Sequence, residues 1–271
     1  MAGEAPTFPK YLAERARIVR AGEIPLLLAH PDWKTPAPAA IWLHGRTASK
    51  EMDPGRYMRW LRAGIAVVAV DLPGHGERGV PEMQESRATL DVIEKALVEI
   101  DPIIASLDAS LFDKSRLGIG GMSLGGMITL RALCEPRAIP FKTAAVEATC
   151  GWLSGMYFPA ENGLHIAPWP IDHPRARAQS LDPAMHLSGF APLPLLALHS
   201  EIDAMVPWEV QRLFLDKLRD HYKAKGADPA LIEVKTWSKT GAPREHIGFG
   251  IFSNDAKNIQ TEFFARTLGA K

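Results

Sequence analysis

The stretch Arg116-Leu-Gly-Ile-Gly-Gly-Met-Ser-Leu-Gly-Gly126 decides the fold, because it joins a short apolar strand to a buried helix through one abrupt turn. Residues 117–120 are typical of a strand end and residues 127–133 of a buried helix, which places Ser123 on the turn itself. Such a turn exposes one side chain at the edge of a sheet and surrounds it with the first amides of the helix. The glycines on either side remove Cβ atoms where the strand, the serine and the helix crowd together. The pattern Gly-x-Ser-x-Gly therefore predicts a nucleophile elbow at Ser123.

The same stretch could also be an ordinary turn or a dinucleotide-binding glycine loop. A run of Ser and Gly also occurs in ordinary turns, so the pattern alone leaves a purely structural turn as an alternative. A glycine loop for a dinucleotide would begin with the spacing of Gly118 and Gly120, but its third glycine would fall at Ser123. The dinucleotide interpretation fails for that reason. The choice between turn and elbow depends on whether a base and an acid follow in the right order.

The length and charge of the chain limit the number of domains and the kinds of partner that we expect. Its 271 residues suit one α/β unit, so we expect a single domain over residues 1–271. Lys and Arg together number 31, and Asp and Glu also number 31, so no net field would attract nucleic acid or an anionic membrane. We expect neither of these partners, and the sequence leaves a homodimer open.

The cysteine and histidine patterns indicate neither a disulfide framework nor a metal centre. The two cysteines, Cys134 and Cys150, each lie in an apolar setting that is typical of a small buried thiol. No His-Glu-x-x-His motif and no paired cysteines occur, so we expect no metal and no cofactor. Residues 1–10 lack the apolar core of a signal peptide, and the longest apolar run, residues 65–70, is too short to span a bilayer. These features favour a cytoplasmic protein.

Strand and helix patterns alternate along most of the chain. Strands are predicted at residues 16–19, 24–28, 39–43, 65–70, 117–120, 143–146, 193–198 and 231–237. Helices are predicted at residues 54–63, 86–107, 127–133, 208–225 and 255–268. The first two strands flank Ala21-Gly22-Glu23, which is typical of a hairpin turn at a sheet edge. The alternation predicts an α/β fold with a mostly parallel, eight-stranded sheet and helices on both faces.

Residues 150–190 are a different kind of sequence, rich in Pro, Gly, Trp and His and poor in periodicity. Because they lie between two predicted strands, we expect a short lid insertion over a pocket. Trp152, Tyr157 and Trp169 are candidates to bind substrate there, although the same aromatics would also suit a small core within the lid. A bulky lid predicts that short to medium acyl groups are preferred.

A serine, an acid and a histidine follow the predicted strands in a fixed order. Catalytic groups of a parallel sheet gather in the loops at the carboxyl ends of its strands, and Ser123, Asp203 and His246 each lie in such a loop. A serine hydroxyl is a weak nucleophile at neutral pH. It therefore needs an imidazole to accept its proton and a carboxylate to orient that imidazole. The order Ser, Asp, His along the chain is that of the α/β-hydrolases.

The chain resembles the α/β-hydrolases over nearly its whole length, and most closely the serine esterases of the dienelactone hydrolase and prolyl-oligopeptidase-like branch. The motifs that carry the resemblance are His44-Gly45-Arg46-Thr47, Asp71-Leu-Pro-Gly-His-Gly76, Gly121-Met-Ser-Leu-Gly-Gly126, Glu201-Ile-Asp-Ala-Met-Val-Pro207 and Glu245-His246. The resemblance implies that Ser123 is the nucleophile, His246 the general base and then acid, and Asp203 the orienting carboxylate. It also implies an oxyanion hole made by the backbone N–H groups of Arg46 and Leu124.

Two departures from that branch bear on the substrate. Dienelactone hydrolases carry a cysteine at the elbow where this chain has Ser123. Prolyl-oligopeptidase relatives usually carry a β-propeller, and because only roughly forty residues precede the His-Gly motif, we expect none here. We expect a serine hydrolase that cleaves small-molecule carboxylic esters through an acyl-enzyme. The alternatives are a thioesterase, a small peptidase or an acyltransferase with the same triad, or a non-catalytic binding protein on the same fold.

Other residues compete for two of the roles. Glu201 and Glu147 are alternatives to Asp203 as the orienting acid, but Val206 and Pro207 complete the family pattern after Asp203. Three arginines are candidates for a clamp on a substrate carboxylate, although long cationic side chains usually lie in solvent. These arginines are Arg46, Arg175 and Arg177.

Overall fold

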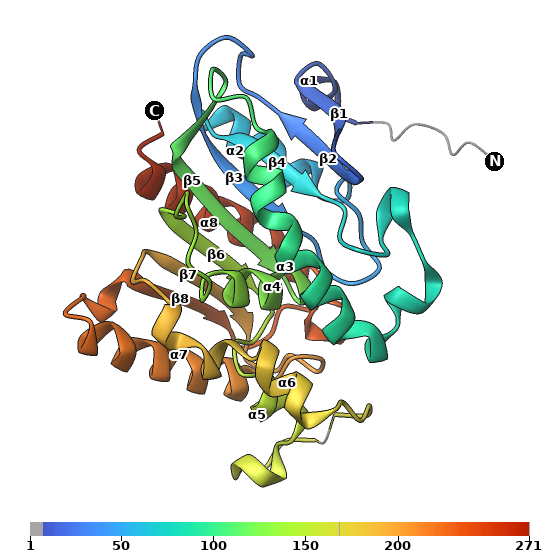
Figure 1. Ribbon diagram of the computed structural model, residues 1–271, viewed down its shortest axis with the longest axis vertical. Coiled ribbons are helices and arrows are strands. Elements are labelled where there is room, and N and C mark those ends of the chain that lie inside the picture. The colour runs from blue at the N-terminus through green and yellow to red at the C-terminus, as the bar shows by residue number, and fades with distance from the viewer. Residues whose placement is uncertain (1–7, 168, 271) are drawn as a thin grey trace.

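One twisted sheet is the frame on which the other elements are placed. The computed structural model describes residues 8–167 and 169–270. The strands in this part of the chain are β1 (Ala16–Ala21), β2 (Ile24–Ala29), β3 (Ala37–Leu43), β4 (Ala66–Val70), β5 (Phe112–Met122), β6 (Thr143–Glu147), β7 (Leu195–Ser200) and β8 (Ile232–Trp237). They form a single eight-stranded sheet that runs through the centre of the molecule (Figure 1).

The strand order places the predicted elbow near the middle of the sheet. The order is β1-β2-β4-β3-β5-β6-β7-β8, so β5 lies between β3 and β6. The pairs β1–β2 and β2–β4 are antiparallel, and the other five pairs are parallel. Gly22 turns the first hairpin with φ of +60°, a conformation that glycine adopts without strain. The prediction of a mostly parallel, eight-stranded sheet is confirmed.

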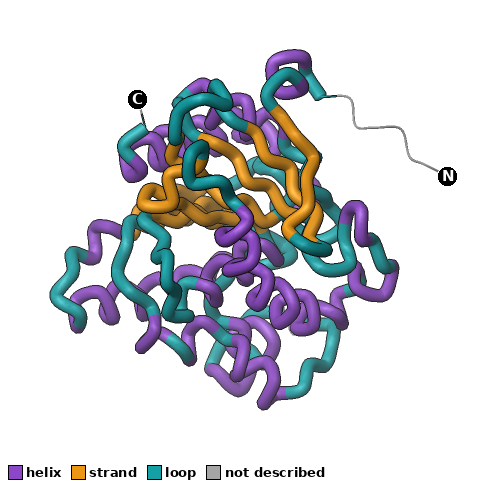
Figure 2. The backbone as a smooth tube through the Cα atoms, turned by 45° about the horizontal axis from the view of Figure 1, so that its top comes forward, coloured by secondary structure: helices purple, strands orange, loops and turns teal. Residues whose placement is uncertain are grey.

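Helices cover both faces of the sheet, as Figures 1 and 2 show. The α-helices in the described residues are α1 (Lys10–Ala13), α2 (Pro54–Arg62), α3 (Thr89–Ser106), α4 (Leu124–Ala132), α5 (Leu153–Tyr157), α6 (Arg175–Leu181), α7 (Trp208–Ala224) and α8 (Ser253–Leu268). Two apolar cores result, one between the sheet and α3, α4 and α7, the other between the sheet and α1, α2 and α8. Successive residues of a strand point to opposite faces of the sheet, so Val68 packs in the first core and Val67 in the second.

The observed elements differ from the predicted ones mainly at their ends. β5 begins at Phe112, well before the predicted start at residue 117. Residues 113–116 of this strand are polar and less buried than the residues that follow, so an apolar pattern could not reveal them. The short helix α1 has a single buried side chain, Leu12, and gave no periodic signal. Both cysteines are buried, as their apolar settings predict.

The predicted lid segment, residues 150–190, carries the short helices α5 and α6 and lies at one end of the molecule (Figure 1). Much of it belongs to the main core, because Cys150, Leu153 and Met156 are buried in the same cluster as α3 and α4. Residue 168, within this segment, is outside the described residues, as are residues 1–7, on which the expectation about a signal peptide partly rests. Within the described ranges, no helix combines the length and the apolar character needed to cross a membrane.

Candidate active site

The turn between β5 and α4 holds Ser123 in a strained conformation. Its φ of +52° and ψ of −116° lie in a region that side chains other than glycine rarely adopt. A Cβ atom on Gly125 would lie 2.0 Å from the Leu43 carbonyl oxygen, and one on Gly121 would lie 2.4 Å from the Gly125 carbonyl. Only glycine fits at these two positions, because the strand and the helix touch there. The sequence around Ser123 thus builds the tight elbow that its glycine pattern predicts.

The structure brings Ser123, His246 and Asp203 together in one hydrogen-bonded chain. The distance from Ser123 Oγ to His246 Nε2 is 2.9 Å, and the distance from His246 Nδ1 to Asp203 Oδ2 is 2.7 Å. In the neutral imidazole that fits this chain, the serine hydroxyl donates to Nε2 and the Nδ1–H donates to the carboxylate. The histidine and the aspartate are both buried, with 4% and 6% of their surfaces exposed. Their mutual orientation is therefore shielded from competing water.

Asp203 is held by groups on its own loop and on the preceding strand. The backbone N–H groups of Met205 and Val206 each donate to Asp203 Oδ1 at 2.8 Å, which leaves Oδ2 for the histidine. His199, at the end of β7, places its Nε2 3.5 Å from Asp203 Oδ2 and 2.9 Å from the Val206 carbonyl oxygen. Burial lowers the pKa of His199, so its ring is neutral at neutral pH. Sequence reasoning missed this supporting histidine, because a strand-terminal His gives no local signal.

The loop that presents His246 is organised around its neighbour Glu245. The Glu245 carboxylate accepts hydrogen bonds from the backbone and hydroxyl of Thr240, at 2.6 and 2.7 Å, and from Gly241 N–H at 2.8 Å. The Ser200 hydroxyl at the end of β7 also donates to it, at 3.1 Å. The hydrogen bonds from Thr240 lower the pKa of Glu245 to about 2, so this loop anchor stays ionised across the physiological range.

The loop after β3 approaches Ser123 from the other side. A Cβ atom on Gly45 would lie 3.7 Å from Ser123 Cβ, which shows how closely this loop passes the nucleophile position. In the described residues, neither the Arg46 N–H nor the Leu124 N–H donates a hydrogen bond to protein. Leu124 follows Ser123 as the first residue of α4, where helix amides have no internal acceptor. Both amides are therefore free to donate to a ligand, and their role as an oxyanion hole stays a prediction.

Three buried side chains support this loop: His44, Asp71 and Tyr57. His44 Nδ1 donates to the Gly45 carbonyl oxygen at 2.7 Å, and its Nε2 accepts from Leu72 N–H at 3.1 Å. This pair of bonds needs the neutral ring, and burial lowers the pKa of His44 to about 4. The Lys50 N–H donates to the buried Asp71 carboxylate at 2.9 Å, and the Tyr57 hydroxyl donates to the Lys50 carbonyl at 2.8 Å. The loop is thus tied to the segment after β4 and to α2.

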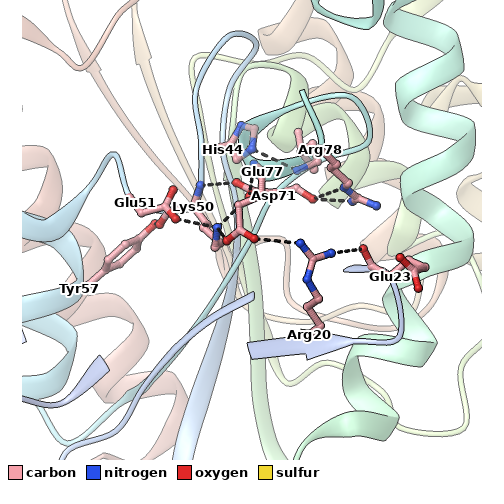
Figure 3. A network of polar contacts seen from close by, with 10 residues as sticks. Arg20, Glu23, His44, Lys50, Glu51, Tyr57, Asp71, Glu77 and Arg78 are labelled. Atoms are coloured by element: carbon pink, nitrogen blue, oxygen red, sulfur yellow. Dashed lines mark hydrogen bonds and ion pairs between the residues drawn. The ribbon is translucent and has the colours of Figure 1, made fainter. Parts of the chain in front are cut away.

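The carboxylates of Glu51, Asp71 and Glu77 lie close enough together to hold a cation. The Lys50 ammonium already lies between them, at 2.6, 2.9 and 2.6 Å, as Figure 3 shows, and Arg20 pairs with Glu77 from outside at 3.0 Å. Burial alone would lower the pKa of Lys50, but the carboxylate partners raise it above its usual value. The cluster therefore has an internal countercharge and serves as a brace for the loop after β3.

A cavity of about 40 Å³ opens at Ser123. The lining residues are Arg46, Ser86, Thr89, Ser123, Leu124, Met127, Met156, Tyr157, Trp169, Met205 and Val206. Tyr157 and Trp169 line this cavity, as their predicted substrate-binding role requires. Trp152 does not line this cavity, contrary to the prediction, because its indole packs over Gly155 and the core instead. The methionines were missed, since a Met in an apolar run is indistinguishable from core.

A second cavity of about 200 Å³ lies beyond the loop after β3. It is bordered by Gly45, Met122 and Ile247, each the chain neighbour of a predicted site residue, and it does not include Ser123. The buried pair of Arg56 and Glu147 forms part of its wall.

The two competing acids lie elsewhere. The Glu147 carboxylate accepts two hydrogen bonds from the Arg56 guanidinium, at 2.7 and 2.8 Å, and one from Gln260 at 3.0 Å. The exposed Glu201 side chain accepts a hydrogen bond from the Thr236 hydroxyl at 2.8 Å. Neither carboxylate contacts His246, so Asp203 is the acid that the structure places beside the imidazole.

The three candidate arginines have different surroundings. Arg175 pairs with Glu161, and Arg177 pairs with Asp91 and Glu94 at 2.6 Å, all on the surface. Arg46 alone among the three lines the Ser123 cavity. A clamp made of all three is excluded, because two of them are already paired away from the serine.

The chain matches the Alpha/beta hydrolase family over residues 40–269. It is 26% identical to Esterase YjfP of Escherichia coli (strain K12) over 204 residues, which cover 68% of this chain and 77% of that protein. A thermophilic esterase of Thermogutta terrifontis, Est2, has the same fold, with a TM-score of 0.66, 18% identity and coverage of 96% of this chain and 94% of that one.

A puromycin-hydrolyzing peptidase of Mycobacterium tuberculosis also shares the fold, with a TM-score of 0.70 and 18% identity over 97% of this chain and 41% of that one. At a sequence identity of 18%, these two solved structures support a shared fold and carry no argument about a shared substrate. The family match spans most of the sequence and contains every residue of the predicted triad. This chain therefore belongs to the alpha/beta hydrolase family.

Proposed function

We propose that this protein is a serine hydrolase that cleaves carboxylic esters with short to medium acyl groups through an acyl-enzyme. The observation that carries the proposal is the hydrogen-bonded chain from Ser123 through His246 to Asp203, at 2.9 and 2.7 Å. A silent binding protein would have no need of a strained serine aimed at an oriented imidazole. The similarity to a protein named as an esterase supports the choice of ester over other acyl substrates.

The proposed reaction follows from the contacts of each group. Ser123 Oγ attacks the ester carbonyl carbon while His246 Nε2 accepts the hydroxyl proton, and Asp203 stabilises the imidazolium that forms. The oxyanion of the tetrahedral intermediate accepts hydrogen bonds from the N–H groups of Arg46 and Leu124. His246 then donates its proton to the departing alcohol, which leaves an acyl group on Ser123. A water molecule, deprotonated by the same imidazole, attacks this acyl-enzyme and releases the acid.

The size of the cavity at Ser123 supports the acyl-chain preference. The cavity is small, about 40 Å³, and Leu124, Met127 and Met156 close it. A short acyl group fits with little movement of these side chains. A long acyl chain would have to displace Tyr157 or Trp169, which are cavity-lining residues of the segment 150–190.

One experiment tests both the nucleophile and the substrate class. A fluorophosphonate probe should label a single peptide containing Ser123, and Ser123→Ala should lower kcat on the order of 10³-fold or more without changing the circular dichroism spectrum. A panel of esters of increasing acyl length, with matched thioesters and aminoacyl amides, should show the highest kcat/KM for short-chain esters. Labelling at another residue would reject the proposed nucleophile. A clear preference for amides or thioesters would reject the esterase and favour the peptidase or thioesterase alternative.

A further inference from the structure

Arg46 contributes a cationic side chain to the cavity at Ser123. Its Nη1 donates to the Glu85 carbonyl oxygen at 2.6 Å, and its Nη2 donates to the Thr89 hydroxyl. Both acceptors are uncharged. Across residues 8–167 and 169–270, no carboxylate lies within ion-pair distance of this guanidinium, which sets it apart from Arg56, Arg175 and Arg177.

An unpaired guanidinium in a half-buried cavity is unfavourable in the absence of ligand. Burial lowers the pKa of Arg46, which reflects the desolvation of the charge. A guanidinium carries five N–H donors in a planar fork, and a single carboxylate can accept two of them side by side. The two hydrogen bonds to Glu85 and Thr89 fix the plane of the fork and leave other N–H groups without a described acceptor. An anion in the cavity would compensate the charge.

Neutral polar groups without partners converge on the same cavity. Tyr157 and Trp169 line it, and neither the hydroxyl of the one nor the indole N–H of the other makes a hydrogen bond to a described residue. Tyr157 is 5% exposed, so little water reaches its side chain. The His173 ring packs 4.3 Å from that of Tyr157, and its Nε2 also lacks a described partner. Buried polar groups are rarely left unsatisfied, so together they indicate a polar ligand.

We propose that the Arg46 guanidinium, with Tyr157 and Trp169, binds a carboxylate at the far end of the acyl group, so that the preferred substrates are monoesters of short dicarboxylic acids. This inference rests on the proposed function, since it names the substrate class of the same site. In this arrangement the backbone N–H of Arg46 would donate to the ester oxygen while its side chain would bind the acyl terminus. One residue would then align both ends of the acyl group with Ser123.

The test compares an anionic ester with an uncharged one of equal acyl length. The substrates are monoethyl succinate and ethyl butyrate, followed by product analysis on chromatography, and the measured quantity is the ratio of their kcat/KM values. The wild type should favour monoethyl succinate. Arg46→Met should lower the ratio on the order of 10- to 100-fold, the loss expected for a charge-assisted hydrogen bond, and Arg46→Lys should retain part of it. Arg177→Met, which removes a paired surface arginine, is the matched control and should leave the ratio unchanged.

The outcomes separate this inference from the proposed function. An equal fall for both esters in Arg46→Met would overturn the carboxylate subsite and assign the guanidinium to the oxyanion or to the loop after β3. A wild type that disfavours monoethyl succinate would overturn it as well. If neither ester is hydrolysed, calorimetric binding of monoethyl succinate to Ser123→Ala, with and without Arg46→Met, decides. Arg46-dependent binding would support the subsite while the esterase proposal fails, and the absence of binding would overturn both.

Discussion

Acidification should destabilise the protein through His44, the buried histidine at the start of the loop after β3. Burial lowers its pKa from 6.5 to about 4, because the folded protein shields the ring and uses its Nε2 as an acceptor for Leu72 N–H. The unfolded chain therefore binds a proton at this ring over a pH range in which the folded protein does not. The contribution of the neutral His44 ring to the free energy of unfolding is fully present above pH 6.5 and falls as the pH drops toward 4.

The size of the effect follows from the gap between the two pKa values. Each pH unit between them changes the free energy of unfolding by about 1.4 kcal/mol, so the gap corresponds to roughly 3 kcal/mol. That is a large share of the total stability of a typical domain, about 5–15 kcal/mol. The neighbouring His75 has a pKa that is also lowered by burial, and its ring lies 5.4 Å from that of His44. The wild type should therefore lose at least this amount.

The assay is urea unfolding at a series of pH values for the wild type and for His44→Gln. Glutamine can still accept a hydrogen bond from Leu72 N–H but does not titrate. The stability difference between wild type and variant should therefore shrink by about 3 kcal/mol between pH 7 and pH 4. The exposed His165, replaced by glutamine, is the control and should follow the wild type throughout. If His44→Gln loses stability in parallel with the wild type, His44 is not the buried neutral ring on which this reasoning depends.

Two further predictions concern the elbow and the acid. Asp203→Asn should lower kcat about 10⁴-fold with little change in stability, by analogy with other Ser-His-Asp triads, whereas Glu201→Gln should leave steady-state rates near those of the wild type. The opposite ranking would remove Asp203 from the triad. Gly125→Ala should destabilise the fold by about 1–3 kcal/mol or more in urea unfolding, because its Cβ would lie 2.0 Å from the Leu43 carbonyl oxygen. Gly45→Ala, whose Cβ has only ordinary contacts at 3.7 Å, should change stability much less, and equal effects would refute the steric argument.

The sequence predicted the parts of this protein that depend on local pattern. The alternation of apolar strands and helices gave the sheet, and glycine spacing placed Ser123 on its turn before α4. Contacts between distant residues were not predictable in this way. Tyr157 and Trp169 reach the cavity at Ser123 but Trp152 packs over Gly155, although all three belong to the same aromatic segment. Which aromatic turns inward depends on the backbone of α5 and on its neighbours, and neither leaves a periodic signal.

Glu147 shows how a plausible catalytic residue can serve the site in another way. From the sequence it competes with Asp203, since both lie at or just beyond the carboxyl end of a strand in the same parallel sheet. What separates them is a partner remote in the chain, because the Arg56 guanidinium on α2 takes both carboxylate oxygens of Glu147. The backbone carbonyl of Glu147 accepts the Ser123 N–H at 2.8 Å. A buried Glu147 carboxylate that lost its arginine would strongly destabilise the fold, so the pair fixes β6 and, through that one hydrogen bond, the strained turn at Ser123. Glu147 therefore supports the turn at Ser123 through the backbone, while Asp203 is the carboxylate that contacts the His246 imidazole.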